Sequence, residues 1–257
     1  MQDTPVCLIT GSATGIGAAC AREFARHGWQ VALSHLDDAT LADARAVAVE
    51  CETAGATTLL LQLDVRDDSA CVRFAQAALQ RWGRIDALVN CAGTTRFIAH
   101  TDLAALDAAE FQRTYDVNVI GAYQMVRACS EALKVSGQGS VVNISSIGGV
   151  LGRGSSMAYA ASKGALNTLT LVLARSLAPQ VRVNAIAPGF VDGGLPARVL
   201  SLAEHTQVLT LQTTASVLKR VSQPEEVAAL AWFLCAQAPG MTGEVLMLDN
   251  GLHLNAG

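Results

Sequence analysis

The sequence predicts an α/β fold: a single Rossmann-type domain with a doubly wound parallel sheet of about seven strands and helices on both faces. Two observations lead to this prediction. Short apolar runs alternate with longer amphipathic stretches along all 257 residues, which is the pattern of repeated strand–helix–strand units. Several short runs are apolar throughout, as expected for parallel strands that are covered by helices on both faces.

The individual elements follow from this alternation. The expected strands are residues 6–10, 30–34, 58–63, 87–90, 140–144, 181–187 and 244–248. The expected helices are residues 16–27, 39–54, 69–82, 108–133, 156–177 and 225–237. No linker-like tract or fixed repeat interrupts this order, so residues 1–257 are expected to form one domain.

One segment departs from the alternation. Residues 192–222 are largely apolar, but no strand follows promptly, and a helical insertion outside the sheet is expected there. Ligands of doubly wound folds bind beyond the carboxyl ends of the strands, so such an insertion is well placed to cover a substrate pocket. A surface helical hairpin or a subunit interface explains the pattern equally well.

The charge, the apolar stretches and the cysteines limit which partners and which cellular compartment are expected. The net charge is −4 without a basic cluster, which argues against a nucleic-acid partner. No apolar stretch reaches the roughly 18 residues of a membrane-spanning helix, so no membrane partner is expected. The first five residues lack the features of a secretion signal, and the seven scattered cysteines show no C-x-x-C spacing. A cytoplasmic protein with reduced cysteines and no metal site is predicted.

Residues 10–17 (T-G-S-A-T-G-I-G) join the first expected strand to the first expected helix. Their three glycines let the backbone turn sharply and approach a ligand. The helix start offers unpaired N–H groups and the positive end of a dipole to a pyrophosphate. The segment predicts a dinucleotide site, although glycine-rich turns are common and the spacing differs from G-x-G-x-x-G.

Two further features point to the same ligand. Asp64 ends the third expected strand and is placed to meet an adenine edge, or to cap the next helix. The small residues of N90-C-A-G93 follow the fourth expected strand, where they would let a ribose approach the backbone.

Tyr159 and Lys163 are one helical turn apart, and Ser146 precedes the tyrosine by 13 positions. Two charges ~4 Å apart interact by about 4 kcal/mol at an effective dielectric of ~20, enough to lower a tyrosine pKa of about 10 by up to about three units. A phenol near cytosolic pH is suited to proton transfer, and a serine hydroxyl can hold a carbonyl or alcohol oxygen. A Tyr–Lys pair on an exposed helix face is also common without any catalytic role.

As a set, these motifs resemble those of the short-chain dehydrogenase/reductase (SDR) family, in the branch that includes 3-oxoacyl-carrier-protein reductases. The motifs that carry the resemblance are residues 10–17, Asp64-Val65, N90-C-A-G93, Asn118, Ser146, Tyr159-x-x-x-Lys163 and Pro188-Gly189. The resemblance extends from residue 4 to about residue 251 and implies an NAD(P)(H)-dependent oxidoreductase that interconverts a carbonyl and a secondary alcohol.

The resemblance also assigns catalytic roles. Tyr159 would be the general acid for reduction and the base for oxidation, while Ser146 orients the substrate oxygen. Lys163 would lower the pKa of the tyrosine and bind the nicotinamide ribose. Asn118 would hold a water that links Lys163 to solvent, although a buried helix asparagine bonded to backbone is the plainer interpretation.

Cofactor contacts follow from the same resemblance. They are expected at Gly11, Ser12, Thr14, Gly15, Ile16, Gly17, Ser34, His35, Asp64, Val65, Asn90, Ala92, Gly93, Tyr159, Lys163, Pro188, Gly189 and Val191. Members of the family that prefer NAD carry an aspartate at the position of His35, so NADP(H) is favoured here. Ser34 and His35 would meet the 2′-phosphate, although Asp37 and Asp38 would oppose it if they faced it, and His35 is equally an inert surface residue.

The sequence also departs from the family pattern. Cys91 replaces an asparagine beside the cofactor, and Gly193 replaces a threonine that holds the nicotinamide amide, which would loosen the cofactor or the covering segment. Substrate contacts are expected at Thr95, Arg96, Ile147, Leu151, Arg153 and Leu195. Leu151, Leu195, Val199 and Leu202 would form an apolar lid. Arg96 and Arg153 would meet an anionic group or are solvated surface charges.

Two other functions stay open from the sequence: a non-catalytic dinucleotide-binding sensor or scaffold, and a non-redox enzyme such as an epimerase or dehalogenase on the same fold. A small carbonyl or alcohol substrate is expected for an oxidoreductase. The resemblance implies a homotetramer or homodimer that pairs through the helices at 108–133 and 156–177.

Overall fold

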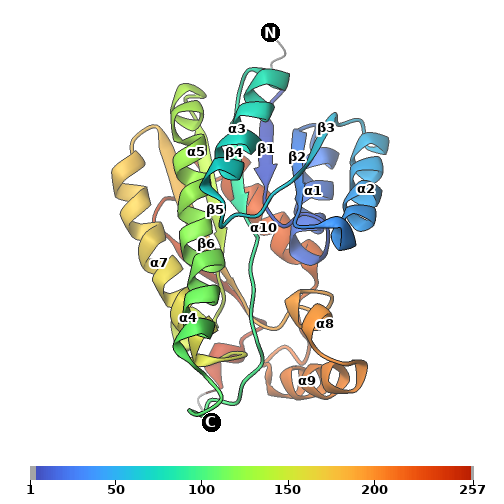
Figure 1. Cartoon of the computed structure of the whole chain (residues 1–257), viewed down its shortest axis with the longest axis vertical. Coiled ribbons are helices and arrows are strands. Elements are labelled where there is room, and N and C mark those ends of the chain that lie inside the picture. Colours follow the sequence, from blue (N-terminus) through green and yellow to red (C-terminus); the bar gives the residue numbers. More distant parts are fainter. Residues whose placement is uncertain (1–3, 256–257) are drawn as a thin grey trace.

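A computed structural model of the chain describes residues 4–255 and shows a seven-stranded parallel sheet with helices on both faces (Figure 1). This confirms the predicted fold class. Residues 1–3, which contributed to the predicted compartment, and residues 256–257 lie outside the described part.

The strands follow the order β3-β2-β1-β4-β5-β6-β7 across the sheet. They are β1 (Val6–Ile9), β2 (Gln30–His35), β3 (Thr58–Gln62), β4 (Ala87–Asn90), β5 (Gly139–Ile144), β6 (Val181–Pro188) and β7 (Val245–Leu248). The direction of winding reverses at β1, where Leu8 pairs with Ala32 of β2 on one side and with Leu88 of β4 on the other. A crevice is expected outside the carboxyl ends of the strands at such a switch point.

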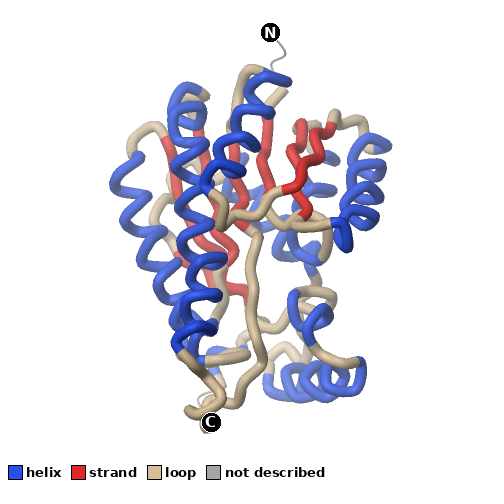
Figure 2. The backbone as a smooth tube through the Cα atoms, in the orientation of Figure 1, coloured by secondary structure: helices blue, strands red, loops and turns tan. Residues whose placement is uncertain are grey.

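Helices form a layer on each face of the sheet (Figure 2). One layer contains α1 (Gly15–Arg26), α2 (Asp38–Thr53) and α10 (Pro224–Ala236), and its core includes Phe24, Val47 and Leu234. The other contains α3 (Asp68–Trp82), α5 (Ala122–Val135) and α7 (Met157–Leu177), and its core includes Phe74, Met125 and Leu133. Because both faces are covered, the central strands are apolar throughout.

The predicted helix at 108–133 is in fact three segments: α4 (Ala108–Tyr115), the π-helix η1 (Asp116–Gly121) and α5. π-Helical turns are rare and frequently occur at functional sites. A side chain at Gly121 would clash with Val65, so the chain passes close to the end of β3 here. Hydrophobic periodicity does not reveal such a local widening, and the prediction was wrong in this detail.

The segment that was expected to insert outside the sheet contains α8 (Leu195–Val199) and α9 (Leu202–Ala215). Both helices lie at the carboxyl end of the sheet, apart from the two helical layers (Figure 1). Neither contains a fully buried residue, so the segment is attached to the body by a thin layer of contacts. Two short elements complete the fold, α6 (Gly148–Leu151) and the 3₁₀ helix η2 (Leu252–Leu254). No helix within residues 4–255 combines the length and apolar character that crossing a bilayer requires.

Gly17 allows the start of α1 to pack directly on the preceding turn. A Cβ at this position would overlap the carbonyl oxygen of Gly11 and would lie 3.0 Å from the Cα of Ser12. The neighbouring atoms are backbone, so they cannot move aside as the end of a side chain can.

We therefore expect Gly17→Ala to lower the free energy of unfolding by about 1–3 kcal/mol, measured by urea denaturation. Gly240→Ala is the matched control, because nothing lies within 4 Å of a Cβ added there. Equal stability of the two variants would contradict the packing role given to Gly17.

Candidate active site

A cavity of about 860 Å³ lies at the carboxyl end of the sheet. It is lined by the glycine turn before α1, by the segments that follow β2, β3, β4, β5 and β6, and by α8 and α9. Its size and position match those of a cofactor or ligand site in a doubly wound fold.

The glycine turn forms one wall. Gly11 and Gly15 have φ values of +64° and +56°, which favour glycine. An added Cβ would lie 2.9 Å from the Cα of Ala92 at Gly11, and 3.0 Å from the Gly193 carbonyl oxygen at Gly15. Thr14 is the N-cap of α1 but makes no side-chain cap bond, so the first N–H groups of the helix are left for other acceptors. The turn is shaped to receive an anion such as a phosphate.

Two residues that were predicted to contact the cofactor, Ser12 and Ser34, hold this turn from behind. Ser12 is buried; its hydroxyl donates to the Ser34 carbonyl (3.2 Å) and accepts from the Ser34 N–H (2.7 Å). The Ser34 hydroxyl accepts from the Gly11 N–H (3.0 Å) and donates to the Ile9 carbonyl (3.3 Å). Asn90 is buried and donates to Asn143 Oδ1 (2.9 Å). Ser12, Gly17 and Asn90, which were expected to contact the cofactor, are not among the residues that line the cavity. Ser34 lines it, but its hydroxyl is already occupied.

At the adenosine end, His35 and Asp64 both line the cavity. His35 is only 7% exposed, so the interpretation as a surface histidine is wrong. Its Nδ1 lies 3.0 Å from the Asp37 carbonyl, which assigns a proton to Nδ1. Asp64 does not cap α3, whose N-cap is Asp67. Instead Arg66 binds Asp64 at 2.6 Å and holds the pKa of that carboxyl below its ordinary value.

Tyr159, Lys163 and Ser146 meet at the opposite end of the cavity. Ser156 caps α7 by accepting from the Tyr159 N–H at 3.2 Å, which fixes the first turn of the helix. Lys163 Nζ donates to the Ile144 carbonyl at the end of β5 (2.7 Å) and lies 5.7 Å from the centre of the Tyr159 ring. Ser146 accepts from the Gly148 N–H at 3.0 Å and hydrogen-bonds Tyr159.

The electrostatics of this group differ from the prediction. Burial raises the pKa of Tyr159 to about 12, and the hydrogen bond from Ser146 offsets only part of that rise. Burial also lowers the pKa of Lys163 from 10.5 to about 8. The predicted fall of the tyrosine pKa toward neutrality is wrong for the protein's own groups, because loss of solvent outweighs an ammonium that faces the Ile144 carbonyl.

Asn118 lies in the π-helix and is almost fully buried. Its Oδ1 accepts from the Thr94 N–H (2.8 Å), and its Nδ2 donates to the Thr94 carbonyl (3.0 Å) and to Ser162 Oγ (3.0 Å). A Cβ at Gly93 would lie 3.5 Å from Asn118 Oδ1 and 3.8 Å from Lys163 Nζ, which places the two side chains on either side of one small space. The contacts observed are those of the plainer interpretation, a buried asparagine bonded to backbone.

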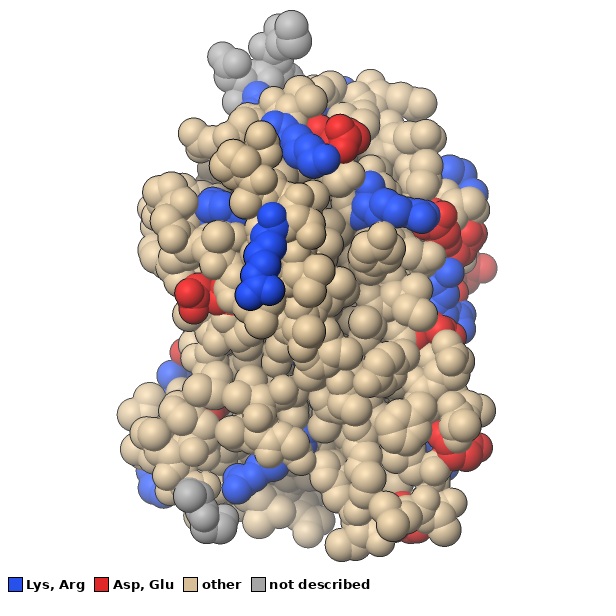
Figure 3. Space-filling model, turned by 90° about the vertical axis from the view of Figure 1, so that its left-hand side faces the viewer, with Lys and Arg blue, Asp and Glu red and all other residues tan. Residues whose placement is uncertain are grey.

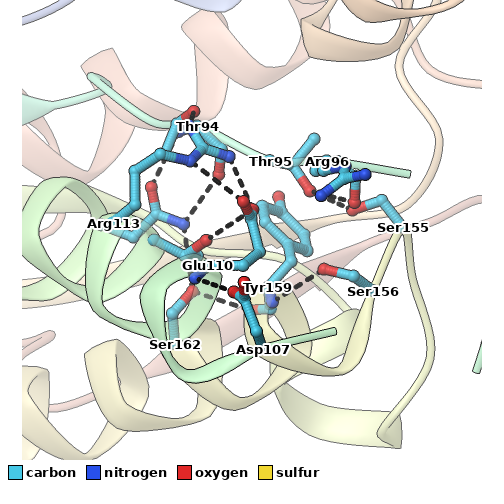
Figure 4. Close-up of polar contacts among 12 residues, drawn as sticks. Thr94, Thr95, Arg96, Asp107, Glu110, Arg113, Ser155, Ser156, Tyr159 and Ser162 are labelled. Carbon is cyan, nitrogen blue, oxygen red and sulfur yellow. Dashed lines mark hydrogen bonds and ion pairs between the residues drawn. The ribbon is translucent and has the colours of Figure 1, made fainter. Parts of the chain in front are cut away.

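Two residues that the sequence did not single out support Thr94 (Figure 4). Arg113 donates to Thr94 Oγ1 at 2.7 Å and pairs with Glu110 at 2.6 Å. Both are on α4, and the carboxylate is buried. Their i,i+3 spacing predicts an ion pair on one helix face. The path of the loop that contains Thr94, which they support, could not be predicted from the sequence.

The predicted substrate residues divide into two groups. Thr95, Ile147, Arg153 and Leu195 line the cavity, whereas Arg96 and Leu151 do not. Of the expected lid residues, Val199 also lines the cavity, but Leu202 is 84% exposed and faces away from it. Phe97, Phe190, Arg198, Val208 and Gln212 also line the cavity, and the sequence had not identified them.

Cys91 lines the cavity beside the glycine turn. Burial raises the pKa of its thiol to about 12, so the thiol stays protonated and weakly reactive at neutral pH. All seven cysteines are unpaired. Among residues 4–255, no group of three or more His, Cys, Asp or Glu side chains is arranged to hold a metal ion.

Comparison with known proteins agrees with this geometry. A family model described as enoyl-(acyl carrier protein) reductase matches residues 11–253. The crystal structure of a short-chain dehydrogenase/reductase from Burkholderia xenovorans is 52% identical, with a TM-score of 0.93 over 99% of this chain and 100% of that one.

Two curated relatives are similar over nearly their whole length. The granaticin polyketide synthase ketoacyl reductase 2 of Streptomyces violaceoruber is 38% identical over 98% of this chain and 97% of its own. The 3-oxoacyl-[acyl-carrier-protein] reductase of Thermotoga maritima is 32% identical over 96% and 97%. The chain belongs to the short-chain dehydrogenase/reductase family, in the branch that includes the ketoacyl reductases. It is an NAD(P)-dependent oxidoreductase.

The lowered pKa of Lys163 has a measurable effect on stability. Burial disfavours the ammonium, so the folded protein carries a penalty that is complete below pH 8 and disappears as pH rises through the ordinary value of 10.5. We expect Lys163→Met to unfold at higher urea concentration than the native protein at pH 7, by about 3 kcal/mol, with the difference vanishing toward pH 10.5.

Lys134→Met is the control, because Lys134 is a partly exposed lysine that pairs with Glu131 at the surface. It should show no such gain. A stability difference for Lys163→Met that does not change between pH 7 and pH 10 would contradict the buried-ammonium penalty.

Proposed function

We propose that this protein is an NADP(H)-dependent reductase of a ketone, of the ketoacyl reductase type, with Tyr159 as general acid. The single observation that carries the proposal is that Ser146, Tyr159 and Lys163 line the same cavity as the glycine turn. A dinucleotide that reaches across this cavity would bring its nicotinamide beside the tyrosine.

The residues present fit such a cofactor. The glycine turn would hold the pyrophosphate, and Pro188, Gly189 and Val191 form the wall next to the catalytic group. Gly93 leaves open the space beside Lys163 Nζ, where a ribose would lie. Once bound, the reduced nicotinamide supplies the hydride that the carbonyl carbon accepts.

The protein's own part in the reaction is to orient the carbonyl and to deliver a proton. Ser146 and Tyr159 would both donate hydrogen bonds to the carbonyl oxygen, and these strengthen as negative charge develops there. Tyr159 then transfers its proton to that oxygen, which completes the alcohol. With a pKa of about 12, the phenol is protonated at neutral pH and ready for reduction.

Lys163 would restore the proton to Tyr159. Its pKa of about 8 makes it a mostly protonated but readily deprotonated ammonium at neutral pH. Asn118, which lies across the small space at Gly93, would place the link from Lys163 to solvent. The raised pKa of the tyrosine keeps the phenol protonated, and the lowered pKa of the lysine favours return of a proton to the phenolate. Both shifts maintain the protonated phenol that reduction requires, and this supports reduction as the working direction.

The substrate side of the cavity is largely apolar, and Arg153 lies on it. Phe97, Phe190, Leu195 and Val208 face it, and Arg153 precedes Gly154, where a Cβ would lie 3.5 Å from the Tyr159 ring. We therefore infer a largely apolar ketone whose anionic or strongly polar group reaches Arg153.

The preference for NADP(H) is supported at the end of β2. Asp37, which would oppose a phosphate, accepts from the Thr40 N–H as the cap of α2, and neither Asp37 nor Asp38 lines the cavity. His35 and Thr40 do line it, and His35 Nε2 is the free edge of its ring. In this arrangement neither Asp37 nor Asp38 would face a 2′-phosphate, and the carboxylate of Asp64 is paired with Arg66.

We expect His35→Asp to reverse the preference, since a carboxylate would repel the 2′-phosphate and accept from the ribose hydroxyls. The Kd for NADPH should rise at least about tenfold and the Kd for NADH should fall, both by fluorescence titration. Because both constants come from one variant, their ratio is insensitive to partial misfolding. An unchanged ratio would place the 2′-phosphate elsewhere.

The proposal extends to the assembly and the compartment. Phe111, Ile120, Tyr123, Leu171 and Val172 expose more than a third of their surface each, on the α4–α5 and α7 segments. Figure 3 shows few charged side chains across the middle of the face on this side of the molecule. Such a surface supports pairing into a homodimer or homotetramer.

Seven unpaired cysteines support a reducing, cytoplasmic location.

The central experiment is the variant Tyr159→Phe. Removing the phenol should lower kcat for ketone reduction by about 10²–10⁴-fold, because the proton donor is lost. NADPH should still bind with a similar Kd, since the cavity wall keeps its shape. Absorbance of the reduced nicotinamide follows the reaction with a panel of ketones.

Tyr115→Phe is the matched control, because this tyrosine does not line the cavity. Full turnover in Tyr159→Phe would refute the proposed role of the phenol. Tight NADPH binding without turnover of any ketone by the native protein would instead indicate a sensor or scaffold.

A further inference from the structure

The glycine turn receives no positive side chain of its own. Residues 10–17 contain neither lysine nor arginine, so a diphosphate held there would meet only backbone N–H groups and the helix dipole. A dinucleotide diphosphate carries two negative charges, and charge-assisted hydrogen bonds are about twice as strong as neutral ones. A cation that compensates this charge would therefore have to come from another part of the cavity wall.

Among the residues that the structure describes, the Lys and Arg side chains that line the cavity are Arg66, Arg113, Arg153, Lys163 and Arg198. Arg66 is bound to Asp64 and Arg113 to Glu110, both at 2.6 Å. Lys163 is bound to the Ile144 carbonyl, and Arg153 lies beside the catalytic tyrosine. Arg198 alone is left for the phosphate side of the cavity.

The position of Arg198 relative to the turn is set from two directions. Gly194, which precedes α8, packs on the turn: a Cβ at Gly15 would lie 3.0 Å from the Gly193 carbonyl oxygen and 3.5 Å from the Cα of Gly194. Arg198 is four residues further along, about 6 Å of helix rise and well within the reach of an arginine side chain. On the other flank, burial raises the pKa of the Cys91 thiol, and the charges of Lys163 and Arg198 offset part of that rise.

Cys91 and Ala92 border the turn directly, because a Cβ at Gly11 would lie 2.9 Å from the Cα of Ala92. Arg198 thus lies on a segment that packs on the Gly15 flank of the turn, and its charge acts on Cys91 at the other flank. Arg198 lines the same cavity as the turn, and no carboxylate of the described residues is paired with it.

The helix that carries Arg198 is weakly attached to the body. α8 and α9 contain no fully buried residue. The contacts that hold the segment include the His205–Asp192 pair at 3.6 Å and the Phe190 and His205 rings at 5.6 Å. A ligand that binds Arg198 would therefore add a substantial share of the force that closes this segment over the cavity.

We propose that Arg198 binds the diphosphate of the dinucleotide from the covering segment and so couples closure of α8 and α9 to cofactor binding. The inference rests on the proposed function, since it requires a dinucleotide in this cavity. Arg198 would supply a side-chain contact to the cofactor, which the glycines at 193 and 194 cannot provide. The guanidinium fork suits two phosphate oxygens at once, which a lysine does not match.

The test compares Arg198→Ala, Arg198→Lys and Arg45→Ala in the full-length protein. Arg45 is an exposed arginine on α2 away from the cavity, so its variant makes the same charge change without touching the site. Isothermal titration with NADPH, NADH and ADP-ribose should show Kd values about 10- to 100-fold higher in Arg198→Ala for all three. Arg198→Lys should be intermediate, and Arg45→Ala should match the native protein.

Two further readouts are independent of turnover. The dependence of log Kd on log salt should be shallower in Arg198→Ala, because one ionic contact is lost. In hydrogen–deuterium exchange, NADPH should protect residues 195–215 in the native protein and protect them less in Arg198→Ala. Adenosine, which has no phosphate, should bind both proteins equally.

Three outcomes would overturn the inference. An unchanged Kd for all the dinucleotides would remove Arg198 from the site. Weaker binding of NADPH alone would assign Arg198 to the 2′-phosphate, and a higher KM for the ketone alone would assign it to the substrate. If the native protein binds no dinucleotide, the proposed function fails as a whole; if it binds and reduces while Arg198→Ala binds equally well, only this inference fails.

Discussion

The buried contact of Lys163 with the Ile144 carbonyl is the constraint on which the site depends. It ties α7 to the carboxyl end of β5 and places Tyr159 and Ser146 on the same side of the cavity. The same burial separates the two pKa values, to about 12 for the phenol and about 8 for the ammonium. A protein that only needed stability would not bury a lysine here, because an isolated ammonium is costly to desolvate.

A second set of contacts keeps the site in shape from behind. The hydroxyls of Ser12 and Ser34 join the glycine turn to β2, and Asn118 joins the π-helix to the backbone of Thr94. None of these side chains needs to touch a ligand in order to matter, because each fixes a backbone segment that does. The catalytic end is thus held by the body of the fold, while the covering segment of α8 and α9 is held weakly. A rigid floor under a loosely attached cover suits an enzyme that must admit two ligands in turn.

The sequence was sufficient to predict the fold because its signals are local: apolar runs mark the strands, and a glycine turn marks the start of α1. It also predicted that Tyr159 and Lys163 share one helix face, since that depends on spacing alone. Contacts between distant residues were beyond it. The Ser12–Ser34 bond spans 22 positions, the π-helix leaves no trace in hydrophobic periodicity, and the pKa of Tyr159 depends on burial that only the packed structure defines. Arg198 was missed for the same reason, because an arginine in an irregular segment gives no sign of what it faces.

The ionisation of Tyr159 is the measurement that tests the role of burial at this site most directly. The chain has only three tyrosines, so ¹³Cζ-tyrosine labelling gives three resonances in NMR, and Tyr159→Phe identifies the relevant one. Burial that raises the pKa to about 12 predicts that this resonance keeps the chemical shift of a neutral phenol from pH 6 to pH 10. A shift to the phenolate position near pH 7 would show that the ammonium, and not burial, governs the phenol, and would contradict the account.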